Sequence, residues 1–410
     1  MNDIPRHLEP QVDELLKQFP AVILVGARQV GKTSLAKKIR PNWAYFDLEK
    51  PTDFDRITRD PVFFFENHPD AVILDEAQES HELFKCLRGV IDAQRQKKNR
   101  FLLTGSSSPL LIERVSESLA GRVAVLEVGT LKMTEFYKQP LSPFYDFFAS
   151  KLSPVKLLEL TPRIPSGAVR DFWVRGGYPE PVLAEDEAFW FSWMENYFQT
   201  YLNRDIRKLF PRLDLIRFRR FVSVLAKLSG QYVNKAQMAS AIEVSEPVIR
   251  DYIDIVDGTF LWRKLPSFES SADKLISKAP KGYLRDSGLL HYLLRLSTLE
   301  DILNDPMAGF SFESFVVEEI LKGLTARGIQ NWEASSYRTR NRSEVDLILK
   351  GFFGILPIEI KLGNKLSSRS TVALRNFMVA HKLSFGLVVY SADKVDWIEN
   401  GILGVPVGCL

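Results

Sequence analysis

The residues best suited to chemistry lie in one short segment near the amino terminus. Residues 26–33 read GARQVGKT, which fits the spacing G-x-x-x-x-G-K-[ST]. In this pattern the glycines let successive backbone amides point at phosphate oxygens, and the start of the following helix adds positive potential. Lys32 would bridge the β- and γ-phosphates, and the Thr33 hydroxyl would ligate Mg²⁺. The alternative is an ordinary turn with a solvated lysine. The predicted nucleotide-binding residues are Gly26, Ala27, Arg28, Gln29, Val30, Gly31, Lys32, Thr33 and Ser34.

Two adjacent acids close the apolar run at residues 71–74. Asp75 would hold Mg²⁺ through water, and Glu76 would polarise the water that attacks the γ-phosphate. Phosphoryl transfer depends mostly on positioning and charge neutralisation, so these few groups are sufficient chemistry. The alternative for Asp75 is the N-cap of a helix after the strand, a common use of aspartate. Beside the glycine-rich loop, the pair predicts Mg²⁺-dependent ATP hydrolysis.

Small hydroxyl side chains and an arginine extend this predicted catalytic set. Thr104 ends the apolar run 101–104, and Ser106 follows it, so both would lie at a strand end beside the γ-phosphate. Arg122 immediately precedes the next apolar run. It would reach the γ-phosphate of its own site or of a neighbouring subunit as an arginine finger, and Arg114 is the rival candidate. The alternative for Arg122 is a favourable cation at a helix C-terminus.

A second group of acids lies near the carboxyl terminus. Asp346 is near the start of an apolar strand pattern, and Glu359 and Lys361 share one face of a later strand because side chains alternate with a period of two. With Glu313 from an upstream helix, these carboxylates would hold a second divalent cation. Lys361 would then orient or deprotonate a metal-bound water for attack on a phosphodiester. The alternative is an ion-paired, half-exposed strand face, which produces Glu-x-Lys easily.

These residues depend on elements that the hydrophobic pattern predicts. Apolar runs favour buried parallel strands at 21–25, 44–48, 71–74, 100–104 and 123–128, with helices at 33–39 and 83–98. Helices at 213–228, 234–242 and 245–257, followed by an apolar strand at 259–265, resemble a winged helix. The last part predicts a helix at 311–326, strands near 332–337, 344–349 and 355–360, a helix at 371–381 and a strand at 385–390.

The fold class predicted is therefore α/β with three parts: a parallel-sheet ATPase domain (1–140), a helical, winged-helix-like region (141–265) and a mixed α/β domain (266–410). The would-be recognition helix at 245–257 carries Glu246, Asp251, Asp254 and Asp257. Acids repel phosphates, so a structural or protein-contact role is favoured for this helix over DNA reading.

Composition describes an ordinary globular protein. The 410 residues hold 54 basic and 51 acidic side chains, a net charge of +3, and mean hydropathy is −0.09. A dedicated nucleic-acid domain usually shows a clear basic excess. Two cysteines and five histidines exclude a disulfide framework and disfavour a four-ligand zinc site. Apolar runs of strand length and an opening without a secretory pattern predict a cytoplasmic protein without membrane association.

In order and motif, the chain resembles prokaryotic AAA+ ATPases that carry a C-terminal domain of unknown function with a fold like that of PD-(D/E)xK nucleases. The resemblance implies ATP binding, a winged-helix-like middle and a nuclease-like end. We expect an ATPase that acts on or near DNA, or alternatively a nucleotide switch that binds a protein partner and has an inert nuclease-like fold. A homo-oligomer is compatible with either alternative. The matching stretches are 26–34, 74–76, 103–107, 121–122, 175–179, 202–206, 284–290 and 344–361.

Overall fold

The computed structural model describes residues 4–106, 118–184, 186–268, 279–339, 343–366 and 370–410. The chain divides into two compact units, one made of Met1–Leu131 with Gly258–Phe260, the other of Lys132–Asp257 with Leu261–Leu410. The predicted helical middle and C-terminal part therefore belong to one compact unit. The finer division at residue 265 stays a prediction.

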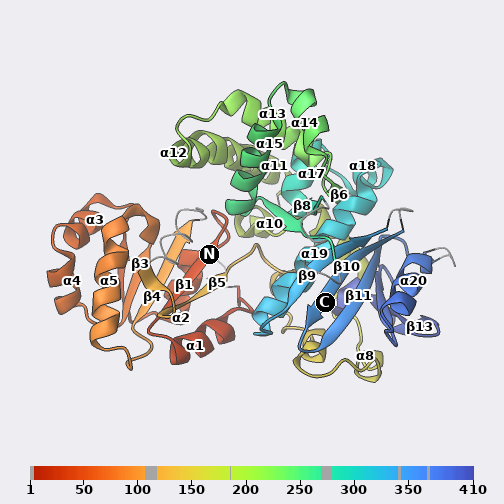
Figure 1. Ribbon diagram of the computed structural model, residues 1–410, viewed down its shortest axis with the longest axis horizontal. Helices are drawn as coiled ribbons and strands as arrows, with labels where there is room; N and C mark the ends of the chain where they lie inside the picture. Colours follow the sequence, from red (N-terminus) through yellow and green to blue (C-terminus); the bar gives the residue numbers. More distant parts are fainter. Residues whose placement is uncertain (1–3, 107–117, 185, 269–278, 340–342, 367–369) are drawn as a thin grey trace. The chain divides into compact units, whose positions relative to one another are not determined.

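The first unit is built on a parallel five-stranded sheet in the order β2-β3-β4-β1-β5 (Figure 1). Parallel strands need long crossovers, which the helices supply. This arrangement confirms the predicted α/β class. The strands are β1 (Ala21–Gly26), β2 (Ala44–Asp47), β3 (Val72–Asp75), β4 (Phe101–Ser106) and β5 (Val123–Glu127). The helices are α1 (Glu9–Gln18), α2 (Lys32–Ile39), α3 (Pro51–Thr58), α4 (Pro61–Asn67) and α5 (His81–Ala93), with the 3₁₀ turn η1 (Ala77–Glu79).

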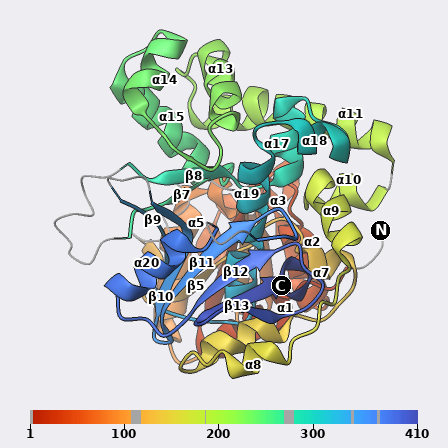
Figure 2. The same ribbon diagram turned by 90° about the vertical axis from the view of Figure 1, so that its right-hand side faces the viewer.

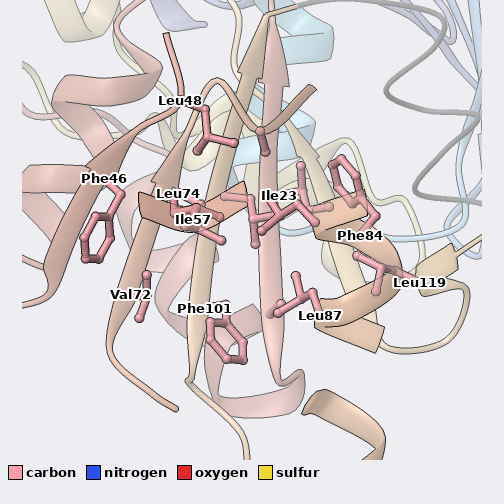
Figure 3. Packing of buried hydrophobic residues seen from close by; sticks show 14 of the residues in the cluster. Ile23, Phe46, Leu48, Ile57, Val72, Leu74, Phe84, Leu87, Phe101 and Leu119 are labelled. Atoms are coloured by element: carbon pink, nitrogen blue, oxygen red, sulfur yellow. The ribbon is translucent and has the colours of Figure 1, made fainter. Parts of the chain in front are cut away.

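The core of this unit explains why apolar runs predicted its strands. Every residue of β1 is buried, because helices cover both faces of a central parallel strand. Figure 3 shows Ile23, Leu74 and Phe101 packed with Phe84 and Leu87 in one cluster. The five strands lie within two residues of their predicted positions, whereas α5 ends at Ala93, five residues before the predicted end at Lys98.

The second unit begins with short helical segments and continues into a helical middle. Its helices α13, α14 and α15 lie within two residues of the predicted triplet. The stretch 202–206 falls in a π-helical segment. The bounds are α7 (Met133–Phe136), η2 (Pro143–Ala149), α8 (Val155–Leu158), α9 (Ser166–Arg175), α10 (Pro179–Ala184), α11 (Glu187–Thr200), η3 (Tyr201–Ile206), α12 (Arg207–Leu209), α13 (Leu215–Ala226), α14 (Lys235–Ile242) and α15 (Glu246–Gly258).

A small antiparallel sheet, β6-β8-β7, accompanies this triplet and leads to α17 (Ser287–Leu294) and α18 (Leu299–Asn304). Asp286 accepts hydrogen bonds from the backbone of Leu289 (2.9 Å) and of Gly177 (2.8 Å). A Cβ on Gly288 would lie 2.1 Å from the Arg175 carbonyl oxygen. Two of the stretches that carry the family resemblance, 175–179 and 284–290, therefore hold each other in place. The strands are β6 (Gln231–Tyr232), β7 (Trp262–Leu265) and β8 (Lys281–Leu284).

The C-terminal part is a mixed six-stranded sheet in the order β13-β14-β12-β11-β10-β9 (Figure 2). The helix α20 packs on it through Leu374 and Phe377, which join a core with Ile348 and Val388. The predicted helices and strands are confirmed, and β13 and β14 are additions that the sequence did not indicate. The elements are α19 (Ala308–Ala326), β9 (Glu333–Arg338), β10 (Glu344–Gly351), β11 (Gly354–Lys361), α20 (Val372–Ala380), β12 (Gly386–Tyr390), β13 (Asp396–Glu399), β14 (Ile402–Pro406) and η4 (Val407–Cys409). Throughout the described ranges, none of the helices has the length and apolar character needed to cross a bilayer.

Candidate functional site

The loop after β1 requires glycine at both ends. Gly26 has a φ of 155°, and a Cβ on it would lie 2.1 Å from the Val128 carbonyl oxygen. Gly31, at the N-cap of α2, has a left-handed φ of 93°. Other residues adopt this region at a cost in strain. The loop therefore has the tight turn that the sequence pattern predicts, and it leads directly into the N-terminus of α2, the positive end of the helix, which suits an anion.

Lys32 places a positive charge inside this loop. The side chain is 5% exposed, and Nζ donates to the carbonyl oxygens of Gly26 (3.1 Å) and Ala27 (2.8 Å). Hydrogen bonds from an ammonium to an anion are stronger than those to a neutral carbonyl. A phosphate in the loop would therefore compete well for this ammonium.

Asp75, at the end of β3, is the centre of a hydroxyl network. Its carboxylate, 4% exposed, accepts from Thr33 Oγ1 (2.9 Å to Oδ2), from the Tyr45 hydroxyl (2.7 Å) and from the Thr104 hydroxyl. Burial and the hydrogen bond to Asp75 raise the pKa of Tyr45 well above its ordinary value. Hard cations such as Mg²⁺ take oxygen ligands. The adjacent Thr33 hydroxyl and Asp75 carboxylate fit such an ion, held directly or through water.

Glu76 follows in a left-handed conformation, with a φ of 52°. Left-handed backbone is uncommon for residues other than glycine and concentrates at functional sites. The Glu76 amide donates to Thr104 Oγ1 (3.4 Å), and Gln78 Nε2 donates to the Glu76 carboxylate. Thr104 thus contacts both acids. In the β1–β4 register Ser106 stands opposite Gly26, so its backbone lies at the sheet edge that carries the loop.

The four predicted residues of the C-terminal site come together in the second unit. Lys361 Nζ lies 2.5 Å from Glu359 Oε1 and 4.0 Å from Asp346 Oδ2. The backbone amide of Ile360 donates to Asp346 (2.9 Å). Glu313 reaches the same group from α19, and burial and the nearby Asp346 carboxylate raise its pKa to about 7. Burial and the same carboxylate raise the pKa of Glu359 to about 8.

A lysine that the sequence did not single out lies among these acids. Lys281, on β8, is 1% exposed. Its Nζ lies 2.5 Å from Glu313 Oε1, 2.6 Å from Glu344 Oε1 and 3.4 Å from Asp346 Oδ1. Burial alone would lower the pKa of Lys281, but the surrounding carboxylates hold it well above its ordinary value. We call Lys281, Glu313, Glu344, Asp346, Glu359 and Lys361 the acid cluster.

Comparison with known proteins places this geometry in a family. Residues 18–137 match the family described as "AAA domain", and residues 308–410 match "Domain of unknown function (DUF4143)". Residues 166–300 match "Domain of unknown function (DUF8612)". The uncharacterized protein Rv2008c of Mycobacterium tuberculosis is 30% identical over 395 residues, which are 95% of this chain and 81% of that protein. The chain belongs to this family of AAA+ P-loop ATPases with a C-terminal domain of unknown function.

Other proteins show more distant similarity. The uncharacterized protein MJ1544 of Methanocaldococcus jannaschii is 26% identical over 255 residues, 61% of this chain and 52% of that protein. Among solved structures, the Walker-type ATPase PABY2304 of Pyrococcus abyssi matches with a TM-score of 0.43 and 15% identity, covering 70% of this chain and 94% of that one.

Of the two arginine-finger candidates in this AAA+ family member, the structure describes one, Arg122. Arg122 is bound to Asp92 of its own chain, with Nε 2.7 Å from Oδ1 and Nη2 2.8 Å from Oδ2. It precedes β5 at the amino edge of the sheet, whereas the glycine-rich loop follows the carboxyl end of β1. Arg114 lies outside the described residues, and its role stays a prediction.

Four residues near the two sites escaped sequence reasoning. Tyr45 contacts Asp75 from β2, and Lys281 and Glu344 join the acid cluster from β8 and β10. Arg6 donates from Nη1 to the Val30 carbonyl (2.8 Å) and from Nη2 to the Gly129 carbonyl (2.8 Å), which ties the loop to the segment after β5. Of these residues, Tyr45 was the easiest to predict from the sequence. It is a side chain with a polar end in an apolar strand, and that strand lies next to the one that ends in Asp75.

Proposed function

We propose that this protein binds and hydrolyses ATP with Mg²⁺ at the site formed by residues 26–34, Asp75 and Glu76. The observation that supports the proposal is the contact between the Thr33 hydroxyl and the Asp75 carboxylate. It joins the glycine-rich loop to the acidic strand end, so one nucleotide and its cation would contact both motifs.

Each residue has a distinct task in this proposal. The loop amides and Lys32 bind the phosphates, and Thr33 and Asp75 hold the cation, which neutralises charge on the phosphates when bound. Glu76 polarises the water that attacks the γ-phosphate, since it is the acid next to Asp75 that is not committed to the Thr33 hydroxyl. Thr104, in contact with Asp75 and with the Glu76 amide, fixes the orientation of both acids.

The test separates nucleotide binding from turnover. We expect Lys32→Ala to abolish ATP binding, because the loop loses its only lysine and the charge it directs at the phosphates. Glu76→Gln should bind ATP normally and lose turnover by roughly a hundred-fold or more, because the amide cannot accept a proton. Glu79→Gln, an equal loss of charge three residues away, is the matched control and should hydrolyse ATP at the wild-type rate. Normal hydrolysis by Glu76→Gln would show that the water-activating residue is another one.

A second candidate function is action on DNA through the second unit. Two observations support it: the meeting of Glu313, Asp346, Glu359 and Lys361, and the element order of the middle region. Helix, strand, two helices and two strands, with a sheet in the order β6-β8-β7, favour a winged-helix-like module. ATP turnover with and without DNA, and binding and cleavage of plasmid and linear DNA with Mg²⁺ or Mn²⁺, test this idea. If the wild type and Asp346→Ala both fail to bind DNA and to cleave it, the hypothesis of action on DNA is wrong.

The alternative is a nucleotide switch that captures a protein partner or a second copy of itself, with an inert nuclease-like fold. The acidic character of α15 favours protein contact for that helix, since Asp251, Asp254 and Asp257 would oppose a phosphate backbone. In this case ATP-dependent oligomerisation or partner capture would be unaffected by Glu359→Ala. A cytoplasmic location is part of both proposals.

A further inference from the structure

The acid cluster does not offer a vacant position for a divalent cation. An ion shared by Glu313, Asp346 and Glu359 was the expectation from sequence. In the described part of the chain, however, no three carboxylate, imidazole or thiolate side chains converge in a way that could hold a metal ion. An ammonium lies among these carboxylates instead, because Lys281 Nζ is 2.5 Å from Glu313 Oε1 and 3.4 Å from Asp346 Oδ1.

The surroundings of Lys281 match what an ammonium needs. An ammonium has three N–H donors and no acceptor, and three carboxylates lie around it: those of Glu313, Glu344 and Asp346. The side chain is 1% exposed. A charge so deeply buried is tolerated only when it is paired and hydrogen-bonded. The Tyr283 hydroxyl, two residues along β8, also donates to Glu313, so β8 supplies both the cation and a donor to its main partner.

We propose that the Lys281 ammonium is the resident cation among Glu313, Glu344 and Asp346, in the place where a metal-dependent nuclease fold would hold a divalent ion. The wild-type cluster then takes up no divalent metal. The inference rests on the second unit alone and is independent of ATP hydrolysis. It narrows the DNA hypothesis, because hydrolysis of a phosphodiester by a metal-bound water would not occur at this cluster, whereas binding of DNA by the same unit is unaffected.

Removal of the Lys281 charge should have a measurable effect on metal binding. If Lys281 replaces a metal, removing its charge should leave oxygen ligands arranged around a cation-sized position. Those ligands would be Glu313, Glu344 and Asp346, and Glu359 lies close to Asp346. Oε2 of Glu359 is buried and, among the described residues, has no hydrogen-bond partner, so a further oxygen atom is already free to turn to an ion. Lys281→Met keeps the length of the side chain and removes the ammonium, and it should therefore create a divalent-metal site.

The experiment measures Mn²⁺ binding to the nucleotide-free full-length protein by calorimetry and electron paramagnetic resonance. All samples carry Asp75→Asn, which removes the acid of the other candidate site. We expect no uptake by the Lys281 parent, about one tightly bound Mn²⁺ per chain in Lys281→Met, and loss of that ion when Asp346→Asn is added. Lys281→Arg keeps the charge and is the matched control that should take up no metal.

Two results would overturn the proposal. One is Mn²⁺ binding by the Lys281 parent that Asp346→Asn removes, and the other is a folded Lys281→Met protein that binds no Mn²⁺. Thermal unfolding gives a second measurement if the variant is destabilised. Mn²⁺ should raise the midpoint temperature of unfolding of Lys281→Met and leave that of the parent unchanged. If Lys281→Met does not fold even with Mn²⁺, the parent and Lys281→Arg decide, since uptake by either that Asp346→Asn removes contradicts the proposal. ATP turnover of Lys281→Met in the chain with Asp75 intact should stay at the wild-type rate, so a failure of the ATPase proposal is recognised separately.

Discussion

At the scale of single residues, Asp75 shows how the protein stabilises a buried carboxylate. An unpaired buried charge is strongly unfavourable, and here hydroxyl groups from α2, β2 and β4 compensate it. If the Thr33 hydroxyl turned to a metal ion, as we propose, Tyr45 and Thr104 would remain to hold the carboxylate in place. In that proposal Tyr45 is a positioning residue. It would affect Mg²⁺ binding by holding the Asp75 carboxylate in position, and it would not contact the nucleotide.

Tyr45→Phe tests this role, because it removes the hydroxyl and keeps the ring. We expect the Mg²⁺ concentration for half-maximal ATP hydrolysis to rise roughly five-fold, the equivalent of one hydrogen bond of about 1 kcal/mol. Tyr137→Phe is the matched control, since it removes a hydroxyl that donates to the Ala168 carbonyl (2.9 Å) in the second unit. If the Mg²⁺ titration is the same in Tyr45→Phe and the wild type, the Tyr45 hydroxyl does not position Asp75 for Mg²⁺ binding.

At the scale of elements, a chain of hydrogen bonds joins α9, α17 and α19. Trp173 Nε1 donates to Ser311 Oγ (3.0 Å), and Ser311 Oγ lies 2.6 Å from His291 Nε2. His291 Nδ1 lies 2.9 Å from the Val174 carbonyl and must donate to it, since a carbonyl only accepts. The neutral imidazole satisfies this chain, with Nε2 accepting from Ser311. Protonation of Nε2 would turn the Ser311 hydroxyl from donor to acceptor and would place a positive charge in a buried position.

The stability of the second unit should therefore depend on pH. Burial lowers the pKa of His291 to about 4 in the folded protein, against about 6.5 in an unfolded chain. Between these values the unfolded chain binds more protons, so the free energy of unfolding falls as pH drops from about 6.5 toward 4, by up to about 3 kcal/mol. Denaturant unfolding of the wild type and of His291→Gln at several pH values isolates the contribution of His291 to this pH dependence, because the variant has no imidazole to titrate. An identical pH dependence in both proteins would contradict it.

Sequence patterns captured the elements far better than the contacts between them. The strands of the first sheet were readable because both of their faces are buried, which leaves continuous apolar runs. Asp75 and Thr104 were found because parallel strands bring their carboxyl ends to one edge. Lys281 was not found: β8 has only four residues, and Asp346 follows 65 residues later. No local periodicity reports a contact at that distance. The strand β13 was missed because two of its four residues, Asp396 and Glu399, are acidic, and β14 was missed because Gly404 and Pro406 are unfavourable in a strand.

At the scale of the whole molecule, the position of Arg122 bears on how many chains make one active site. In the parallel β1–β5 pair Ala21 stands opposite Val123, so Arg122 lies at the amino edge of the sheet. The glycine-rich loop begins at Gly26, and a strand of this length separates the two edges by roughly 17 Å. An arginine side chain does not span that distance. If Arg122 is an arginine finger, it serves the nucleotide of a neighbouring copy.

Mixing two inactive variants tests this arrangement. Arg122→Ala should bind ATP and lose turnover by about a thousand-fold, in line with arginine fingers elsewhere. Lys32→Ala should bind no ATP but still present Arg122. If the finger acts between copies, a mixture recovers part of the wild-type turnover, because some interfaces combine an intact loop with an intact arginine. Wild-type turnover per chain should also rise with protein concentration.

The bond to Asp92 supplies the control for this experiment. Asp92→Ala frees the guanidinium without removing it, and an ion pair so exposed to solvent stabilises a fold little. We therefore expect Asp92→Ala to keep turnover. Loss of turnover in Asp92→Ala, together with no recovery in the mixture, would mean that Arg122 has a structural role through its bond to Asp92 and that the finger must be sought at Arg114. The same mixing of Lys32→Ala with Arg114→Ala would then recover activity, which separates the two arginines in one series of measurements.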